Sequence, residues 1–194
     1  MTGDLIPYFS LFLILLSTLE LLVGTRLRRM MIALAIMYLG QFLLLINNWS
    51  LGLSAVELVA GWMAMAILLA SQPSVETDQQ FINRQGTIFR IIAALVIWLL
   101  VFLIAPNVSL ISALPTQATW SALILIGMGL LQLGMTTRPV KVIIGLLTVL
   151  AGFEIFYAAI ENSVLVAGLL AMITIGLAAV GAYMITLPFL ESTE

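Results

Sequence analysis

The sequence predicts an all-α integral membrane protein with about seven transmembrane helices. Three observations predict this class: apolar residues fill 63% of the 194 positions, charged residues fill 8%, and the mean hydropathy is +1.22. A soluble domain needs more polar surface than this composition supplies, so lipid is expected to be the main solvent. A helix needs about 20 apolar residues to cross a hydrocarbon core of about 30 Å, which allows roughly seven crossings joined by short loops.

Seven apolar runs, separated by polar or basic breaks, define the expected spans. They cover residues 5–24, 30–47, 52–71, 88–105, 118–136, 140–160 and 163–189. Strands are not expected, because alternating polarity is missing and a helix satisfies all its backbone groups within lipid. The last run is long enough to tilt or to end before Pro188.

The seven basic residues predict the orientation, because they all fall in breaks on one side of these spans. They are Arg26, Arg28 and Arg29 after the first span, Arg84 and Arg90 before the fourth, and Arg138 and Lys141 between the fifth and sixth. The positive-inside rule then predicts a multi-pass protein with its N-terminus outside and its C-terminus in the cytoplasm.

An internal repeat is predicted at an offset of 112 residues, which pairs Thr25-Arg26 with Thr137-Arg138 and Gly40 with Gly152. The expected organisation is a first three-helix repeat over 1–71, a polar cytoplasmic loop plus linking helix over 72–117, and a second repeat over 118–194. Because one extra helix separates the halves, both repeats run in the same direction. They form a parallel repeat rather than an inverted one.

Three carboxyl groups lie within the spans, at Glu20, Glu57 and Glu154. An ionisable group at the centre of a transmembrane helix costs about 2.5 to 3.5 kcal/mol on insertion scales, so each is a candidate for proton transfer. Glu154 is the deepest, roughly 21 Å from the basic end of its span at 1.5 Å per residue. It is expected either to take up and release protons, with Thr148, Tyr157 and water as relay partners, or to hydrogen-bond a neighbouring helix as a packing residue.

Glu57 and Glu20 lie closer to the ends of their spans. For Glu57 the simplest expectation is that its side chain reaches the outer headgroups. For Glu20 it is an ion pair with Arg26, Arg28 or Arg29 at the membrane surface. A relay of all three carboxyls is the alternative.

Several classes of function are excluded by what the sequence lacks. There is no Cys and no His, which removes zinc sites, iron–sulfur clusters and the usual haem ligation. No nucleotide-binding loop or nucleophilic triad occurs, and no basic surface supports nucleic-acid binding. We therefore expect no metal, no cofactor and no enzymatic activity in the chain by itself.

The second repeat resembles a known family. Its residues Gly127-Met-Gly-Leu-Leu-Gln-Leu-Gly-Met-Thr-Thr-Arg138-Pro-Val-Lys141, followed by Ala151-Gly-Phe-Glu154-Ile, are similar to the subunit K family of NADH-quinone oxidoreductase and its Mrp antiporter relatives. Those small proteins have a basic loop between helices one and two and a carboxylate in helix two. The doubled arrangement with an extra helix resembles hydrogenase-4 component E. In the first repeat, Phe42 stands at the position of Glu154.

The resemblance implies that Glu154 is the proton-transfer carboxylate and that Arg138 and Lys141 form the basic loop. It further implies an accessory subunit of a proton- or sodium-translocating complex in the cell (inner) membrane, bridging larger antiporter-like subunits and other membrane subunits of a hetero-oligomeric complex. Two alternatives remain open. One is a self-sufficient small transporter built on the parallel repeat, and the other is a structural or assembly subunit.

Overall fold

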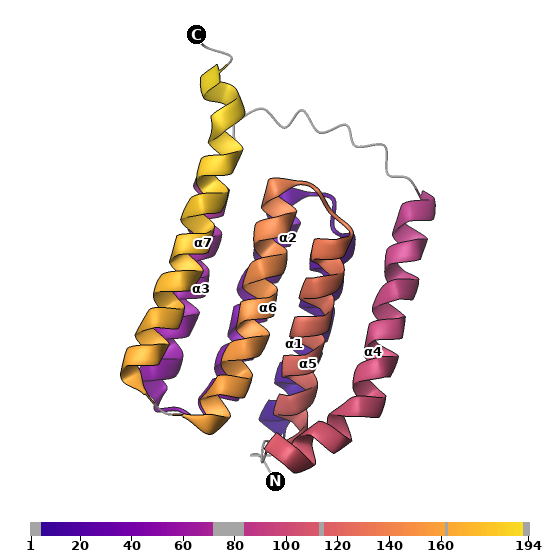
Figure 1. Cartoon of the computed structure of the whole chain (residues 1–194), viewed down its shortest axis with the longest axis vertical. Helices are drawn as coiled ribbons and strands as arrows, with labels where there is room; N and C mark the ends of the chain where they lie inside the picture. The colour runs from indigo at the N-terminus through magenta and orange to yellow at the C-terminus, as the bar shows by residue number, and fades with distance from the viewer. Residues whose placement is uncertain (1–4, 72–83, 113–114, 162, 192–194) are drawn as a thin grey trace.

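The computed structural model describes residues 5–71, 84–112, 115–161 and 163–191, and these residues form helices and no strands (Figure 1). The helices are α1 (Leu5–Val23), α2 (Leu27–Leu45), α3 (Leu51–Ala70), α4 (Arg84–Ser112), α5 (Thr116–Gly134), α6 (Pro139–Ile160) and α7 (Val164–Glu191). All seven are long and apolar enough to cross a membrane. The predicted fold class, a seven-helix multi-pass membrane protein, is confirmed.

Two helices are longer than their apolar runs indicate. Helix α4 begins at Arg84 and continues through Pro106 to Ser112, and Figure 1 shows that it bends toward its C-terminal end. Proline removes one helical hydrogen bond and kinks a helix without always ending it. Helix α7 likewise continues through Pro188, so of the two alternatives for the last span, tilting or ending before this proline, the second is excluded. The expected polar loop falls mostly on residues 72–83, outside the described residues.

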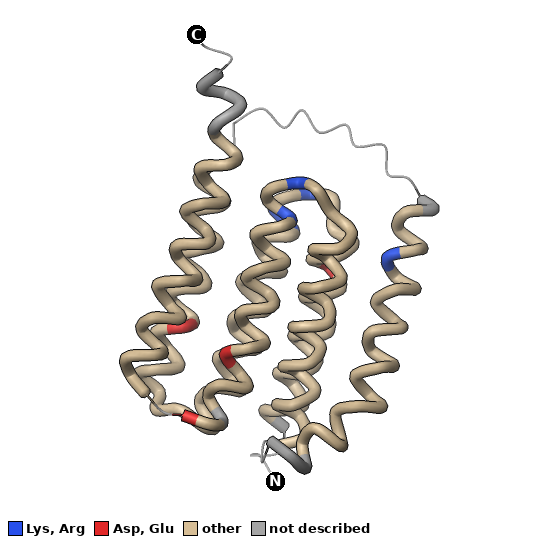
Figure 2. Tube along the Cα trace, in the orientation of Figure 1, with Lys and Arg blue, Asp and Glu red and all other residues tan. Residues whose placement is uncertain are grey.

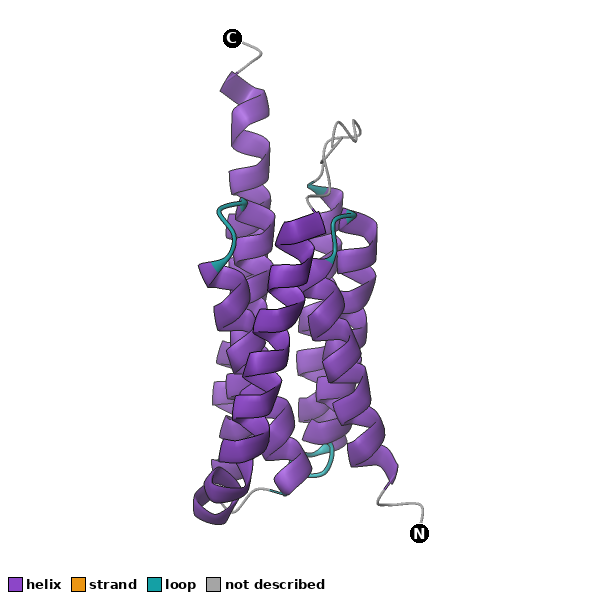
Figure 3. Ribbon diagram, turned by 90° about the vertical axis from the view of Figure 1, so that its right-hand side faces the viewer, coloured by secondary structure: helices purple, strands orange, loops and turns teal. Residues whose placement is uncertain are grey.

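Six of the helices form two layers of three. Figure 1 shows α5, α6 and α7 in front of α1, α2 and α3, and Figure 3 shows the same two layers from the side. Contacts join α1 to α5, α2 to α6 and α3 to α7. Helix α4 packs beside the stack, against α5 and the edge of α1, and turns most of its apolar surface outward.

The two layers are related by a translation. A two-fold axis along the membrane normal would place α1 opposite α7, whereas each helix here lies opposite its own counterpart at the 112-residue offset. Under a translation the inner face of one layer corresponds to the outer face of the other. Thr174 is fully buried while its counterpart Trp62 is 45% exposed, and Glu57 is 1% exposed while its counterpart Leu169 is 52% exposed.

Packing within each layer follows the predicted repeat at its two paired glycines. A Cβ atom on Gly40 would meet Ile14 and the carbonyl oxygen of Ser10, on α1. A Cβ atom on Gly152 would meet Ile126 and the carbonyl oxygen of Ala122, on α5. These neighbours are themselves 112 residues apart, so the same close helix crossing occurs in both layers, as glycine permits in membrane helices.

The basic residues gather at one end of the bundle, as Figure 2 shows in blue. That end holds the α1–α2 and α5–α6 connections and the beginning of α4. The sequence-based prediction that the cations share one side of the spans is therefore confirmed for the described residues. The opposite end holds the α2–α3 and α6–α7 connections, where the indole Nε1 of Trp49 donates a hydrogen bond of 3.0 Å to the carbonyl oxygen of Glu161, its counterpart at the 112-residue offset.

We predict that Gly152→Ala lowers the free energy of unfolding by about 1–3 kcal/mol, the usual range for overpacking a tight interior. The added methyl would lie 2.7 Å from the carbonyl oxygen of Ala122, and backbone cannot swing aside as a side chain does. Thermal unfolding in detergent micelles would measure the change. Gly168→Ala is the matched control, because a Cβ atom there meets nothing within 4 Å. Equal melting temperatures for the two variants would contradict the close α5–α6 crossing.

Candidate functional site

Five buried polar side chains meet where the two layers face each other, and we call them the interlayer cluster. They are Tyr38 and Gln41 on α2, Glu57 on α3, Glu154 on α6 and Thr174 on α7. Each is at most 1% exposed. The cluster therefore draws on both layers and on four different helices, and neither repeat forms it alone.

Glu154 occupies the middle of this cluster. The amide Nε2 of Gln41 donates a hydrogen bond to its Oε2 atom. Glu57 and Tyr38 are close enough for their charged forms to interact with it electrostatically, and Thr174 lies beside both Glu154 and Tyr38. Glu154 thus faces a second carboxyl group, an amide donor and two hydroxyl groups.

Most polar atoms of the cluster are not used in hydrogen bonds with the described residues. These atoms are Tyr38 Oη, Gln41 Oε1, both carboxyl oxygens of Glu57, Glu154 Oε1 and Thr174 Oγ1. Burying such a group without a partner costs about 1–3 kcal/mol. Native proteins hold few of these groups, so their concentration at one point favours a functional role over a packing role.

Glycine makes room for the tyrosine of the cluster. A Cβ atom on Gly61 would overlap the ring of Tyr38, so the ring lies directly against the backbone of α3. This contact brings α2 and α3 together within the first layer and holds the phenol beside Glu154. Gly61 is therefore a positioning residue for the cluster.

The expectation that Glu57 reaches the outer headgroups is wrong. Its side chain is 1% exposed and lies on the inner face of α3, with Ser54 and Gly61 on the same buried face. Position along the span does not decide this point, because a residue near the end of a helix still faces its neighbours when it lies on the packed side. Glu57 instead joins Glu154 inside the protein.

Glu20 is outside the cluster. Its Oε1 atom lies 3.8 Å from Nε of Arg29, so the expected ion pair is present with one of its three named partners. Glu20 lies three residues from the end of α1 at the basic end of the bundle, whereas Glu57 and Glu154 each lie six residues from the opposite end of their helices. The structure therefore brings together two of the three candidate carboxyls and separates the third.

The predicted basic loop contributes a hydrogen bond at the C-terminal end of α1. Lys141 is 9% exposed, and its Nζ atom donates a hydrogen bond of 2.9 Å to the carbonyl oxygen of Gly24, just beyond that helix. Gln132 in turn donates through Nε2 to the carbonyl oxygen of Lys141, at 2.8 Å. Carbonyl groups at helix C-termini lack helical partners and carry negative partial charge, which a cation stabilises. Arg138 is exposed at the N-cap position of α6.

Three members of the cluster were not predicted from the sequence: Tyr38, Gln41 and Thr174. The spacing of Tyr38 and Gln41 could have indicated a shared polar site, because two polar residues three positions apart lie on one helix face. The residues expected to relay protons to Glu154 make other contacts. Thr148 donates to the carbonyl oxygen of Ile144 on its own helix, at 2.7 Å, and Tyr157 packs against the rings of Trp49 and Phe153.

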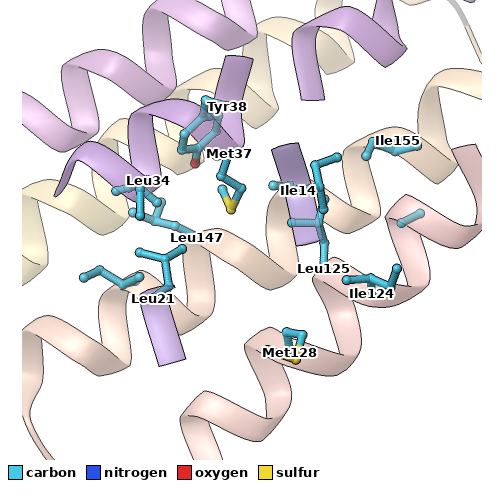
Figure 4. Close-up of a cluster of buried hydrophobic side chains, with 14 of the residues drawn as sticks. Ile14, Leu21, Leu34, Met37, Tyr38, Ile124, Leu125, Met128, Leu147 and Ile155 are labelled. Atoms are coloured by element: carbon cyan, nitrogen blue, oxygen red, sulfur yellow. The ribbon is translucent and has the colours of Figure 1, made fainter. Parts of the chain in front are cut away.

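The hydrophobic side chains around the cluster close it off from lipid. Figure 4 shows Met37, Leu34 and Leu147 packed near Tyr38 between the layers, and all three are fully buried. Among the described residues, no group of three or more acidic, His or Cys side chains is placed to hold a metal ion. The functional groups of the interlayer cluster are carboxyl, amide and hydroxyl groups, and apolar side chains enclose them.

No protein-family model matches the chain, and no curated protein or solved structure matches it either.

We predict that Lys141→Met lowers the free energy of unfolding by about 1.5–3 kcal/mol, the range for a hydrogen bond from a charged donor. The substitution keeps the apolar stem and removes the donor to Gly24. Arg26→Met is the control, since Arg26 is an exposed cation at the same end of the bundle. Chemical or thermal unfolding in detergent would compare the two, and an equal loss in both variants would contradict the capping role.

Proposed function

We propose that this chain is an accessory membrane subunit of a proton- or sodium-translocating complex of the complex I, membrane-bound hydrogenase and Mrp antiporter superfamily. In this proposal it has no enzymatic activity of its own and bridges larger antiporter-like subunits. The observation that carries the proposal is the buried Glu57–Glu154 pair with its unused polar atoms. The resemblance of residues 127–141 and 151–155 to subunit K, which has a carboxylate in the corresponding helix, supports it.

Two carboxyl groups held this close in an apolar interior repel each other when both are ionised. The pair is therefore expected to hold a proton between its two members. Hydroxyl groups both donate and accept hydrogen bonds, so Tyr38 and Thr174, which flank Glu154, are suited to pass a proton to or from it. These are the parts that a single step of a proton path needs.

The depth of the cluster favours unequal access from the two sides. Glu57 lies six residues from the beginning of α3 and Glu154 six residues from the end of α6, or about 9 Å along each helix axis. The basic end is farther away on both helices. With the basic end in the cytoplasm, as the positive-inside rule proposes, the cluster lies in the outer half of the membrane.

A partner subunit is part of the proposal because two grooves on the outer face of the described helices do not reach the interlayer cluster. These lie on the lipid-facing side of the first layer, and none of the cluster residues lines either of them. A self-sufficient transporter is expected to open a polar cavity to each side in turn. A neighbouring antiporter-like subunit would supply the missing part of the path.

We predict that Glu154→Gln reduces proton- or sodium-coupled transport by the intact complex at least about tenfold, because the amide keeps the shape of the side chain but does not take up and release a proton near neutral pH. Glu57→Gln is expected to have an effect of the same order. Transport would be measured with a pH-sensitive dye in everted membrane vesicles. Glu20→Gln is the control, since Glu20 pairs with Arg29 at the bundle surface and lies away from the cluster.

Purification and transport together separate the alternatives. Purification from native membranes in mild detergent, followed by mass spectrometry, is expected to recover antiporter-like and redox subunits with the chain. Recovery of the chain alone, with transport intact in reconstituted vesicles, would favour the self-sufficient transporter. Normal transport in Glu154→Gln together with a lowered melting temperature would assign Glu154 to packing and overturn the proposed role.

A further inference from the structure

Two apolar grooves run along the outer face of the first layer, each beginning at the basic end of the bundle. The α2–α3 groove has a volume of about 420 Å³ and runs from Arg28 to Leu39 on α2. The α1–α2 groove has a volume of about 450 Å³ and begins beside Arg29 and Glu20. Ile32 and Ile36 line both, so the two grooves flank a single ridge of α2.

The depth of the grooves corresponds to one leaflet of a bilayer. Residues 28–39 span about 16 Å at 1.5 Å per residue, and half of a hydrocarbon core of about 30 Å is about 15 Å. The indole Nε1 of Trp62 donates to the carbonyl oxygen of Ala35 at 3.3 Å, at mid-depth of the α2–α3 groove. The grooves thus extend from the basic surface to the middle of the membrane.

In the second layer, the positions that correspond to this outer face are buried against the first layer. Leu69, in the α2–α3 groove, corresponds to Gly181 on the inner face of the second layer, where Leu68 of the first layer packs at 3.0 Å from the Cβ position. Trp62 likewise corresponds to Thr174, which is fully buried between the layers. Helix α4 borders the α1–α2 groove through Ile91, but the other lining residues of both grooves belong to the first layer, so an apolar molecule from outside the chain is needed to fill them.

The charge at the basic end of the grooves indicates which kind of apolar molecule binds there. The Arg28 side chain is exposed and makes no ion pair or hydrogen bond with the described residues. The N-cap residue of α2, Arg26, makes no side-chain cap, which leaves the first N–H groups of the helix directed at the same surface. Arg28 and Arg29 line the grooves, and Glu20 offsets the charge of Arg29 at 3.8 Å, so Arg28 is the groove arginine without a carboxylate partner among the described residues.

We propose that these two grooves bind one anionic glycerophospholipid of the leaflet at the basic end. One acyl chain lies in each groove, on either side of the Ile32–Ile36 ridge, and the phosphate lies at Arg28 and the beginning of α2. Two chains joined at one charged head match two grooves that share a ridge and a cation. Basic pockets between transmembrane helices bind anionic headgroups by this combination of charge and apolar contact.

Native mass spectrometry of the purified chain, titrated with phosphatidylglycerol or phosphatidylcholine of identical acyl chains, tests the proposal. We expect one tightly held lipid, with phosphatidylglycerol bound about fivefold more tightly, since a cation near an anionic headgroup is worth about 1 kcal/mol. Arg28→Gln is expected to abolish that preference by weakening phosphatidylglycerol binding more than phosphatidylcholine binding, because both lipids carry a phosphate but only phosphatidylglycerol has a net negative charge. Arg138→Gln, which removes an exposed cation from the same end but lines neither groove, is expected to keep it.

The apolar part is tested by filling a groove. Ala35→Phe, which places a ring at mid-depth of the α2–α3 groove, is expected to weaken both lipids equally. If Ala35→Phe does not fold, Leu39→Trp fills the deep end of the same groove and replaces it in the test. Equal binding of the two lipids by the unchanged protein, an equal loss of preference in Arg28→Gln and Arg138→Gln, or unchanged binding in both groove variants would each overturn the proposal. A dimer that the groove variants dissociate would assign this face to a second copy of the chain instead.

Discussion

Translation of one three-helix layer onto the other is the constraint on which the rest of the structure depends. Because each helix lies against its own counterpart, the two layers bury opposite faces, and deep within the membrane a carboxyl group finds polar partners only on the face that meets the other layer. The carboxyl and threonine members of the interlayer cluster accordingly have apolar counterparts. Glu57 corresponds to Leu169, Thr174 to Trp62, and Glu154 to Phe42.

Translation of the layers explains why the described residues form one interlayer cluster although the chain has two repeats. Each buried carboxyl costs about 2.5 to 3.5 kcal/mol on insertion scales, and only the interface between the layers offers partners that lessen this cost. Gln41 supplies an amide donor, and Gly61 lets the ring of Tyr38 approach the backbone of α3. A second cluster at the equivalent positions would face lipid. The outer face of the first layer, which lacks such partners, presents apolar grooves with a cation at one end.

The spans were predictable because length and hydropathy decide them, and the basic end followed from the placement of residues such as Arg26 and Arg138. The environment of Glu57 was not predictable, since its sequence position indicates its depth along α3 but not the direction in which it faces. The continuation of α4 through Pro106 was likewise hidden, because a proline bends a membrane helix as readily as it ends one. The partners of Glu154 come from α2, α3 and α7, and local spacing carries no signal for contacts between distant helices.

We propose that the Glu57–Glu154 pair holds a proton that exchanges with water. Infrared difference spectroscopy of the protein in lipid, recorded as the bulk pH is changed, observes the carboxylic-acid C=O band of buried carboxyl groups directly. We expect a band that responds to pH, is lost in Glu154→Gln, shifts in Glu57→Gln and is unchanged in Glu20→Gln. A buried-carboxyl band that is insensitive to pH would contradict it and leave both groups as packing residues.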